Sequence, residues 1–152
     1  MSDFDRPLNE RGLRNGPEMA DRLRQRGIRV SSLLSSPAVR AAATAEMIAP
    51  ALGLASDQVR WEKDLYLASP SVYTYVVQRL SEAKDSVAVV GHNPSLTEWA
   101  NALAQTYLVN VPTLGMVYIE FPHAKTWQQV GPGKGTHLWF DYPKKAFPPE
   151  EE

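Results

Sequence analysis

Two segments of this sequence share one design, in which a short apolar strand runs directly into a turn and then a helix. The first strand is predicted over residues 28–34 and leads into Ser35-Ser36-Pro37, whose second serine can cap a helix and whose proline suits the first helical position. The second is predicted over 86–90 and leads into Gly91-His92-Asn93-Pro94. An uninterrupted apolar strand like 86–90 is typical of the centre of a parallel sheet. The repeated design predicts an α/β fold.

The remaining periodicity extends that prediction along the whole chain. A helix is expected from about Asn9, a plausible N-cap, to residue 25, with Gly27 placed to end it. Pro17 inside this stretch implies either a kink or two consecutive helices. The other expected elements are helices over 37–48, 70–84 and 94–105 and strands over 59–61, 116–121, 128–130 and 138–142. This order predicts a three-layer α/β sandwich with a mostly parallel central sheet, helices on both faces and an antiparallel C-terminal edge.

Length and composition narrow the class of protein. A chain of 152 residues predicts one domain, here over 1–147, followed by an acidic tail at 148–152. The absence of cysteine excludes disulfides and thiolate metal sites, and a net charge of −1 argues against general nucleic-acid binding. No apolar run reaches the length of a membrane span, and the acidic start is unlike a signal peptide. We therefore expect a cytoplasmic protein with no membrane association.

Arg40 lies in the first turn of the helix expected over 37–48. A basic side chain at that place opposes the helix dipole, so its position needs another reason. One reason is a guanidinium that grips phosphate oxygens at the carboxyl end of a strand, where ligands bind in open α/β sheets. The other is a surface arginine that reaches a nearby carboxylate. Position alone leaves both alternatives open.

His92 follows Gly91 at the end of the most apolar strand in the chain. Glycine at that place permits a sharp turn or the close approach of a ligand to the backbone. An imidazole there can act as acid, base, nucleophile or hydrogen-bond donor to a phosphoryl oxygen. The alternative is a histidine that caps the next helix or packs locally. The strand-to-helix position favours a functional role.

Other tempting features carry less weight. The stretch 131–135 contains glycines and a lysine, but no strand-loop-helix pattern surrounds it, so a hairpin loop is expected rather than a nucleotide site. His123 and His137 have no metal-ligand spacing, which indicates structural or surface roles. No serine has a Gly-x-Ser-x-Gly context, which argues against an unrelated serine hydrolase.

Three ordered segments together resemble a known family. They are Asp5-Arg6-Pro7-Leu8-Asn9-Glu10-Arg11-Gly12, then 35–46 (Ser-Ser-Pro-Ala-Val-Arg-Ala-Ala-Ala-Thr-Ala-Glu), then Val90-Gly91-His92-Asn93-Pro94. They look like the SixA-type branch of the histidine phosphatase superfamily, whose fold is phosphoglycerate-mutase-like. Pro112-Thr113 and the segment 140–144 also look like bacterial members, so the resemblance covers nearly the whole chain.

The resemblance implies phosphoryl transfer through a phosphohistidine intermediate, without metal or other cofactor. By this likeness Arg40 grips the phosphoryl group and His92 is the second pocket histidine. Asn93 would adjoin the pocket and Arg6 would line its entrance. Glu62 lies in the general region where relatives place a proton donor, and no local motif fixes it. The implied substrate is a phosphorylated protein carrying phosphohistidine, with a small phosphomonoester as the alternative. Oligomeric state is not readable from the sequence.

One departure from the family pattern is large. Family members begin with a strand that ends in Arg-His-Gly or Arg-His-Ala, and that histidine is the nucleophile. No Arg-His pair occurs in this sequence, which starts at Met1-Ser2-Asp3-Phe4-Asp5-Arg6. We therefore expect the first strand and the nucleophile to be missing, through a start site assigned too late or a truncated chain. The enzyme hypothesis then predicts an inactive chain, and the alternative is a non-catalytic module that binds phosphate or a phosphoprotein.

Overall fold

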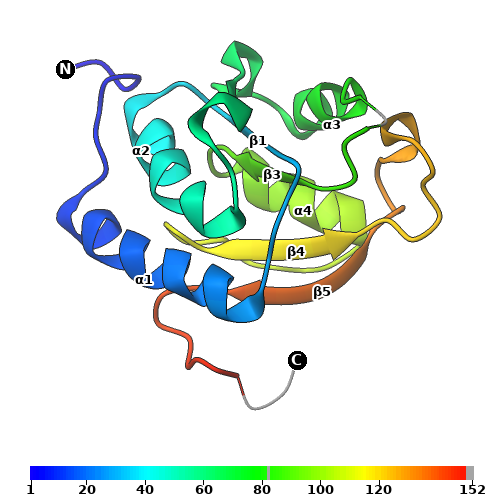
Figure 1. Cartoon of the computed structure of the whole chain (residues 1–152). Coiled ribbons are helices and arrows are strands. Elements are labelled where there is room, and N and C mark those ends of the chain that lie inside the picture. The colour runs from blue at the N-terminus through cyan, green and yellow to red at the C-terminus, as the bar shows by residue number, and fades with distance from the viewer. Residues whose placement is uncertain (82, 150–152) are drawn as a thin grey trace. The chain divides into compact units, whose positions relative to one another are not determined.

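The computed structural model describes residues 1–81 and 83–149, and these form two compact units (Figure 1). One unit comprises Met1–Tyr66 and Lys84–Gly91. The other comprises Leu67–Ala83 and the described residues from His92 onward. The single domain over 1–147 stays a prediction, and the acidic tail falls largely on residues 150–152, which lie outside the described residues. Among the helices described, none combines the length and apolar character that crossing a bilayer demands.

The first unit is built on a parallel sheet with the strand order β2-β1-β3. Ser35 at the end of β1 is level with Trp61 on β2 and with Val90 on β3. All three strands therefore end at one edge of the sheet, and the segments that follow them start from that edge. The elements of this unit are α1 (Glu10–Arg26), β1 (Ser32–Ser35), α2 (Val39–Ile48), β2 (Val59–Trp61) and β3 (Val87–Val90).

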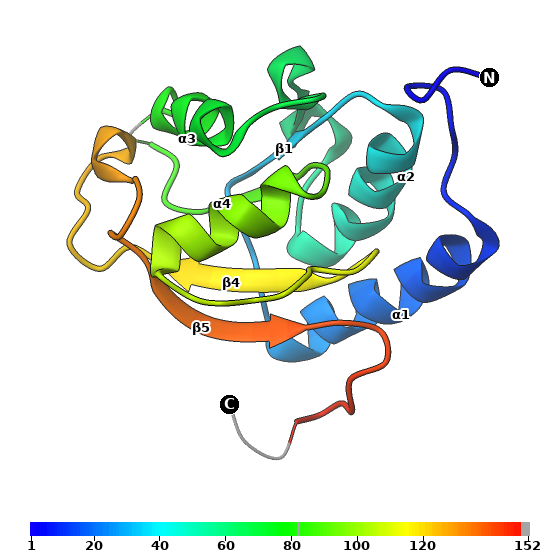
Figure 2. The ribbon, with the colours of Figure 1, turned by 180° about the vertical axis from the view of Figure 1, so that it is seen from behind.

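Helix α1 begins and ends where its capping residues predict. Asn9 Oδ1 accepts a hydrogen bond of 2.9 Å from the Gly12 amide, and Gly27 ends the helix in the left-handed region at φ 69°. Pro17 lies inside this single helix, so the alternative of two consecutive helices is wrong. α1 packs beside α2, as Figures 1 and 2 show, and Gly16 lies against the end of the flexible Met47 side chain, which a β-carbon would displace.

The prediction that strand 86–90 lies at the sheet centre is wrong within this unit. β1 is the middle strand and all four of its residues are buried. β3 pairs with β1 on one side and is only half-buried, although its sequence is apolar throughout. An apolar run reports which side chains avoid water, and it does not report the order of strands in a sheet.

The second unit combines helices with an antiparallel strand pair. α4 lies along β4 in both ribbon views, and α3 packs against α4 (Figures 1 and 2). The strand expected over 128–130 is wrong: Trp127–Gln129 form a single 3₁₀ turn, in which Gln129 Oε1 accepts a hydrogen bond of 2.6 Å from the Lys125 amide. The elements of this unit are α3 (Pro70–Gln78), α4 (Ser95–Ala104), β4 (Met116–Glu120) and β5 (Thr136–Asp141).

The α/β class is confirmed, with a parallel sheet and an antiparallel pair near the C-terminus. Helix α3 ends at Gln78, earlier than the predicted residue 84. Each unit has its own buried core. In the first unit Met19, Leu33 and Leu34 are at most 1% exposed, and in the second Tyr73 is 1% exposed.

Candidate functional site

Arg40 is the second residue of α2, in the first turn beyond the carboxyl end of β1. Ser36 shapes the turn between them: its amide donates 3.0 Å to the Val90 carbonyl of β3, and its hydroxyl accepts 3.2 Å from the Ala38 amide. Both Ser35 and Ser36 are fully buried. The turn is thus fixed by one backbone–backbone hydrogen bond and one bond to a side-chain hydroxyl, and the predicted position of Arg40 in the first turn of a helix is confirmed.

The guanidinium of Arg40 holds the N-terminal residue Asp3. Its Nη1 donates 2.8 Å to the Asp3 carbonyl, and its Nη2 lies 3.3 Å from Oδ2 of the carboxylate. Oδ2 also accepts 2.6 Å from the hydroxyl of Tyr66. Of the two sequence-based alternatives for Arg40, the structure therefore shows a carboxylate partner, and it adds a tyrosine that neither alternative included.

The hydrogen bond between Tyr66 and Asp3 shifts the pKa of both residues. The Tyr66 hydroxyl, followed by the Arg40 guanidinium, lowers the pKa of Asp3 below its usual range. The hydrogen bond to the Asp3 carboxylate in turn raises the pKa of Tyr66. Arg40 and Tyr66 together favour a negatively charged oxygen at this point.

Glu62 and Arg6 belong to the same unit. Glu62 directly follows β2, and its amide donates 2.8 Å to the Ser35 carbonyl at the shared edge of the sheet. Its carboxylate lies 3.3 Å from the guanidinium of Arg60. Arg6 is exposed on the N-terminal segment, where its amide donates 3.2 Å to the Asp3 carbonyl. Their roles as proton donor and entrance residue stay predictions.

His92 begins the second of the two segments that make up the second unit, and it is held through its backbone. Its amide donates 2.9 Å to the hydroxyl of Tyr73, and its carbonyl accepts 2.9 Å from the Leu96 amide in α4. Tyr73 is buried and stacks on Trp99 with 5.1 Å between ring centroids. Burial raises the pKa of Tyr73, which stays a neutral hydroxyl.

Asn93 is occupied by hydrogen bonds within the protein. Its Oδ1 accepts 2.7 Å from the Thr97 hydroxyl and 3.3 Å from the Thr97 amide at the start of α4. Its Nδ2 donates 2.6 Å to the Val111 carbonyl and 3.2 Å to Asn110 Oδ1. These bonds join the residue after His92 to the segment 110–111. The substrate-binding role of Asn93 stays a prediction, and its contacts favour positioning of the turn.

Among the residues that contact the candidates, sequence reasoning missed Asp3, Tyr66 and Tyr73. Tyr73 lies on the buried face of α3, where an aromatic residue indicates core packing. Tyr66 and Asp3 lie in irregular segments without a motif. The only available signal was the place of Tyr66 in the chain. Tyr66 comes shortly after β2, and β2 ends level with β1, the strand that precedes Arg40.

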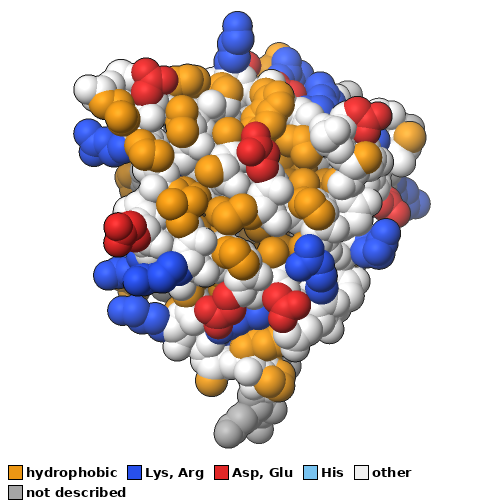
Figure 3. All heavy atoms as spheres, turned by 60° about the vertical axis from the view of Figure 1, so that its left-hand side comes forward, with side chains coloured by type: hydrophobic (Ala, Val, Ile, Leu, Met, Phe, Trp, Pro, Cys, Tyr) orange, Lys and Arg blue, Asp and Glu red, His pale blue; other side chains and the backbone are white. Residues whose placement is uncertain are grey.

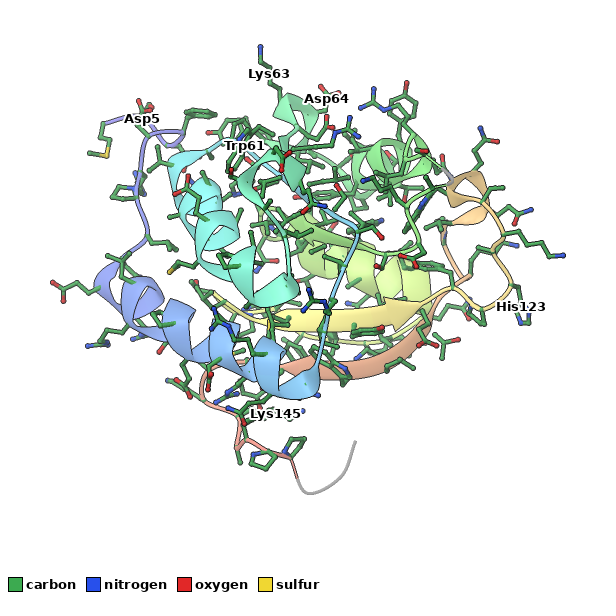
Figure 4. The ribbon with its side chains drawn as sticks, in the orientation of Figure 1. Asp5, Trp61, Lys63, Asp64, His123 and Lys145 are labelled. Atoms are coloured by element: carbon green, nitrogen blue, oxygen red, sulfur yellow. The ribbon has the colours of Figure 1, made fainter. Side chains whose placement is uncertain are left out.

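Two histidines and one glycine-containing loop outside the candidate residues lie in the C-terminal part of the chain. His123 is exposed in the turn after β4 (Figure 4), and His137 lies on β5. The amides of Gly133 and Gly135 donate 2.9 and 2.8 Å to carbonyls of the α4 residues Ala102 and Leu103, so they are not available to a phosphate. Within residues 1–81 and 83–149, no group of three or more His, Cys, Asp or Glu side chains could hold a metal ion.

One face of the molecule carries side chains of both charges. On the face turned forward in Figure 3, Lys and Arg side chains alternate with acidic and apolar ones. Among the residues described, this face shows no extended basic stripe. The observation agrees with the net charge of −1.

Comparison with known proteins gives a family match and several relatives. The model of the histidine phosphatase superfamily (branch 1) matches residues 2–65, which lie within the first unit. A protein of Picosynechococcus sp. named as uncharacterized is 36% identical over 103 residues, which are 67% of this chain and 62% of that protein. A Mycobacterium tuberculosis protein, also named as uncharacterized, is 28% identical over 95% of this chain and 93% of its own length.

Solved structures share the fold. A protein assigned as the phosphohistidine phosphatase SixA of Agrobacterium tumefaciens has a TM-score of 0.78 and 25% identity, covering 94% of this chain and 87% of that chain. The protein histidine phosphatase SixA complexed with tungstate has a TM-score of 0.77 and 24% identity, covering 93% and 87%. The likeness extends over both units of the chain.

Proposed function

Because the chain belongs to the histidine phosphatase superfamily, we propose that Arg40 and His92 bind a phosphoryl group and that the protein is of the phosphohistidine phosphatase type. The observation that carries this proposal is the state of Arg40. Arg40 lies just beyond the carboxyl end of the buried strand β1, and its guanidinium binds an anionic oxygen, Oδ2 of Asp3. A guanidinium fork at such an edge suits the oxygens of a phosphoryl group.

The proposed chemistry is phosphoryl transfer by way of a histidine. The bond from phosphorus to the leaving group breaks as a P–N bond forms to the nucleophilic imidazole, and water then breaks the P–N bond to release phosphate. Arg40 would neutralise charge on the phosphoryl oxygens, and His92 would donate a hydrogen bond to one of them. Glu62 is the proposed proton donor to the leaving group, Arg6 a residue of the entrance, and Asn93 a neighbour of the pocket.

The nucleophile is the missing part of this scheme. The three histidines of the sequence follow glycine, proline and threonine, so no Arg-His pair is present. His123 is exposed in a turn, and His137 lies on β5. We propose that the residues of this sequence supply phosphate recognition without the nucleophile and that they do not turn over a substrate.

That same observation favours a second candidate function, a module that binds phosphate or a phosphoprotein without chemistry. For either function the proposed ligand is a protein carrying phosphohistidine, or a small phosphomonoester. The structural neighbour from Agrobacterium tumefaciens, assigned as a phosphohistidine phosphatase, supports the first ligand class.

Phosphate affinity tests the recognition step. Inorganic phosphate is titrated against Arg40→Gln and His92→Gln, with Arg14→Gln and His123→Gln as controls because both control side chains are exposed. Each charge-assisted hydrogen bond lost weakens binding about tenfold or more, and the controls keep wild-type affinity. Binding that is equal in Arg40→Gln and in the wild type would remove Arg40 from the pocket.

Hydrolysis of p-nitrophenyl phosphate tests the missing nucleophile. The expected result is no turnover above background for this chain, whether or not it binds phosphate. Hydrolysis by this chain that is lost in His92→Ala would contradict the proposal, because it would show that the chain contains its own nucleophile.

A further inference from the structure

Two donors from different segments of the first unit meet at one carboxylate oxygen. Arg40 approaches Oδ2 of Asp3 from the first turn of α2, with Nη2 at 3.3 Å. Tyr66 approaches the same oxygen with its hydroxyl at 2.6 Å. An oxygen that accepts from a guanidinium and a phenol is in the position that an oxygen of a bound oxyanion would take.

The two donors converge because of the sheet. β1 and β2 are parallel neighbours, so the segments that follow them begin at the same edge. Arg40 comes after β1, and Tyr66 comes after β2 and the short 3₁₀ turn Lys63–Leu65. Leu65 is fully buried, which anchors the residue next to Tyr66. The donors are therefore fixed by the core of the unit, whereas their acceptor is not.

Asp3 belongs to a lightly held segment. The Phe4 carbonyl accepts 3.0 Å from the Val39 amide, and the Phe4 ring meets the edge of Tyr66 with 5.1 Å between centroids. Residues 1–7 are all exposed, as the outlying position of Asp5 in Figure 4 illustrates. Together with the bonds that Arg40 and Tyr66 donate to Asp3, these contacts are few compared with those of a buried strand, so the segment can leave its position.

We propose that Tyr66 is a phosphate-binding residue beside Arg40 and that Asp3 occupies their shared position until a phosphoryl group displaces it. The inference rests on the proposed function, because it assigns a further residue and an internal competitor to the same site. The proposal implies two requirements for a ligand of this site. A ligand must offer an oxygen that accepts from both donors, and it must bind more strongly than the carboxylate that it displaces.

The competing interpretation is that Asp3, Arg40 and Tyr66 form only a structural contact that fastens the N-terminal segment. Both interpretations predict that Tyr66→Phe loosens the segment. They differ once Asp3 has been removed, because the structural interpretation then leaves Tyr66 without any effect on phosphate.

The test measures the dissociation constant of inorganic phosphate by calorimetry. Asp3→Asn removes the competing carboxylate and keeps only the backbone carbonyl that accepts from Arg40, so it is expected to tighten binding severalfold, since the apparent constant scales inversely with the open fraction. The double variant Asp3→Asn with Tyr66→Phe is expected to bind about tenfold more weakly than Asp3→Asn alone. The matched controls are Asp5→Asn, a carboxylate on the same segment, and Tyr75→Phe, an exposed tyrosine; both keep wild-type affinity.

Each result decides the inference. Equal affinity in Asp3→Asn and the wild type would overturn the competitor, and equal affinity in Asp3→Asn and the double variant would overturn Tyr66. Absence of phosphate binding in Asp3→Asn would overturn both. Failure of the proposed function gives a different pattern, in which Asp3→Asn with Arg40→Gln binds phosphate as well as Asp3→Asn does.

Discussion

Arg40 and His92 differ in how easily their hydrogen-bond partners can be replaced by a ligand. Arg40 contacts Asp3, an exposed residue of a lightly held segment. His92 is held through its backbone by Tyr73, which is buried and stacked on Trp99. The contact of Arg40 suits a side chain that releases the Asp3 carboxylate when it binds another anion. The contacts of His92 suit a side chain whose position is set before any ligand arrives.

The same contrast separates the two kinds of effect that substitutions should have. Changes around His92 remove buried contacts and should lower the free energy of unfolding of the second unit. Changes around Arg40 remove contacts at the surface and should appear mainly in titration and ligand affinity. Measurements that reverse this assignment would show that the surroundings of Arg40 and His92 do not differ in this way.

The largest effect is expected from Tyr73→Ala, which removes a fully buried ring and its stack on Trp99. We expect the free energy of unfolding to fall by about 3–5 kcal/mol, measured by urea denaturation. The matched control is Tyr75→Ala on the same helix, where the ring is 57% exposed and contacts the Arg79 guanidinium. The control should cost less than about 1 kcal/mol. Similar losses in both variants would show that burial does not distinguish the two rings.

The second effect concerns Asn93. Asn93→Ala removes the acceptor at the start of α4 and the donor to the Val111 carbonyl, so we expect a loss of about 2 kcal/mol in the free energy of unfolding. Asn110→Ala, at an exposed residue that makes only one of these bonds, serves as the control with a loss of about 0.5 kcal/mol or less. A wild-type stability for Asn93→Ala, combined with weaker phosphate binding, would instead assign Asn93 to substrate.

The predictable parts of the fold are those with local causes. The ends of α1 follow from the Asn9 side chain and from the left-handed conformation at Gly27. The position of Arg40 in the first turn of a helix follows from the strand and turn before it. The position of β3 as an outer strand of the three-stranded sheet was not predictable, because strand order depends on pairing between distant segments. An apolar run has the same sequence pattern in a central strand and in an outer one.

The partners of the candidate residues were beyond prediction for the same reason. Asp3 and Tyr66 are 63 positions apart in the chain and lie in irregular segments, so no periodicity brings them together. Tyr73 has the pattern of a core residue, and its hydroxyl reaches the His92 amide 19 positions away. The side chains that could bind a ligand or take part in catalysis could be identified from the sequence, whereas the residues that hold them in place could not.

A smaller effect is expected from Tyr73→Phe, which keeps the ring and removes only the hydroxyl. The His92 amide then loses its acceptor, so we expect a loss of about 1 kcal/mol in the free energy of unfolding and faster hydrogen exchange at that amide. Tyr75→Phe, which changes an exposed hydroxyl, should leave both quantities unchanged. If the His92 amide exchanges as slowly in Tyr73→Phe as in the wild type, the positioning role of Tyr73 is excluded.

The smallest effect is expected at Asp3, where carbon-detected NMR can follow the titration of the carboxyl group. The hydrogen bond from Tyr66 is the largest single cause of its lowered pKa, and Arg40 lowers it both by a hydrogen bond and by its charge, so Tyr66→Phe and Arg40→Gln should each raise that pKa. Because the folded protein lowers this pKa, the contact stabilises the folded segment above the usual pKa of an aspartate, and the contribution is lost as the pH falls through the lowered value. Asp85 is the internal control, since its pKa is lowered by hydrogen bonds from Ser31 and Ser86 and should not respond to either variant. A larger response to Arg40→Gln than to Tyr66→Phe would show that charge, rather than the shared hydrogen bond, holds Asp3 in place, and the exchangeable contact at Arg40 would then be an ordinary ion pair.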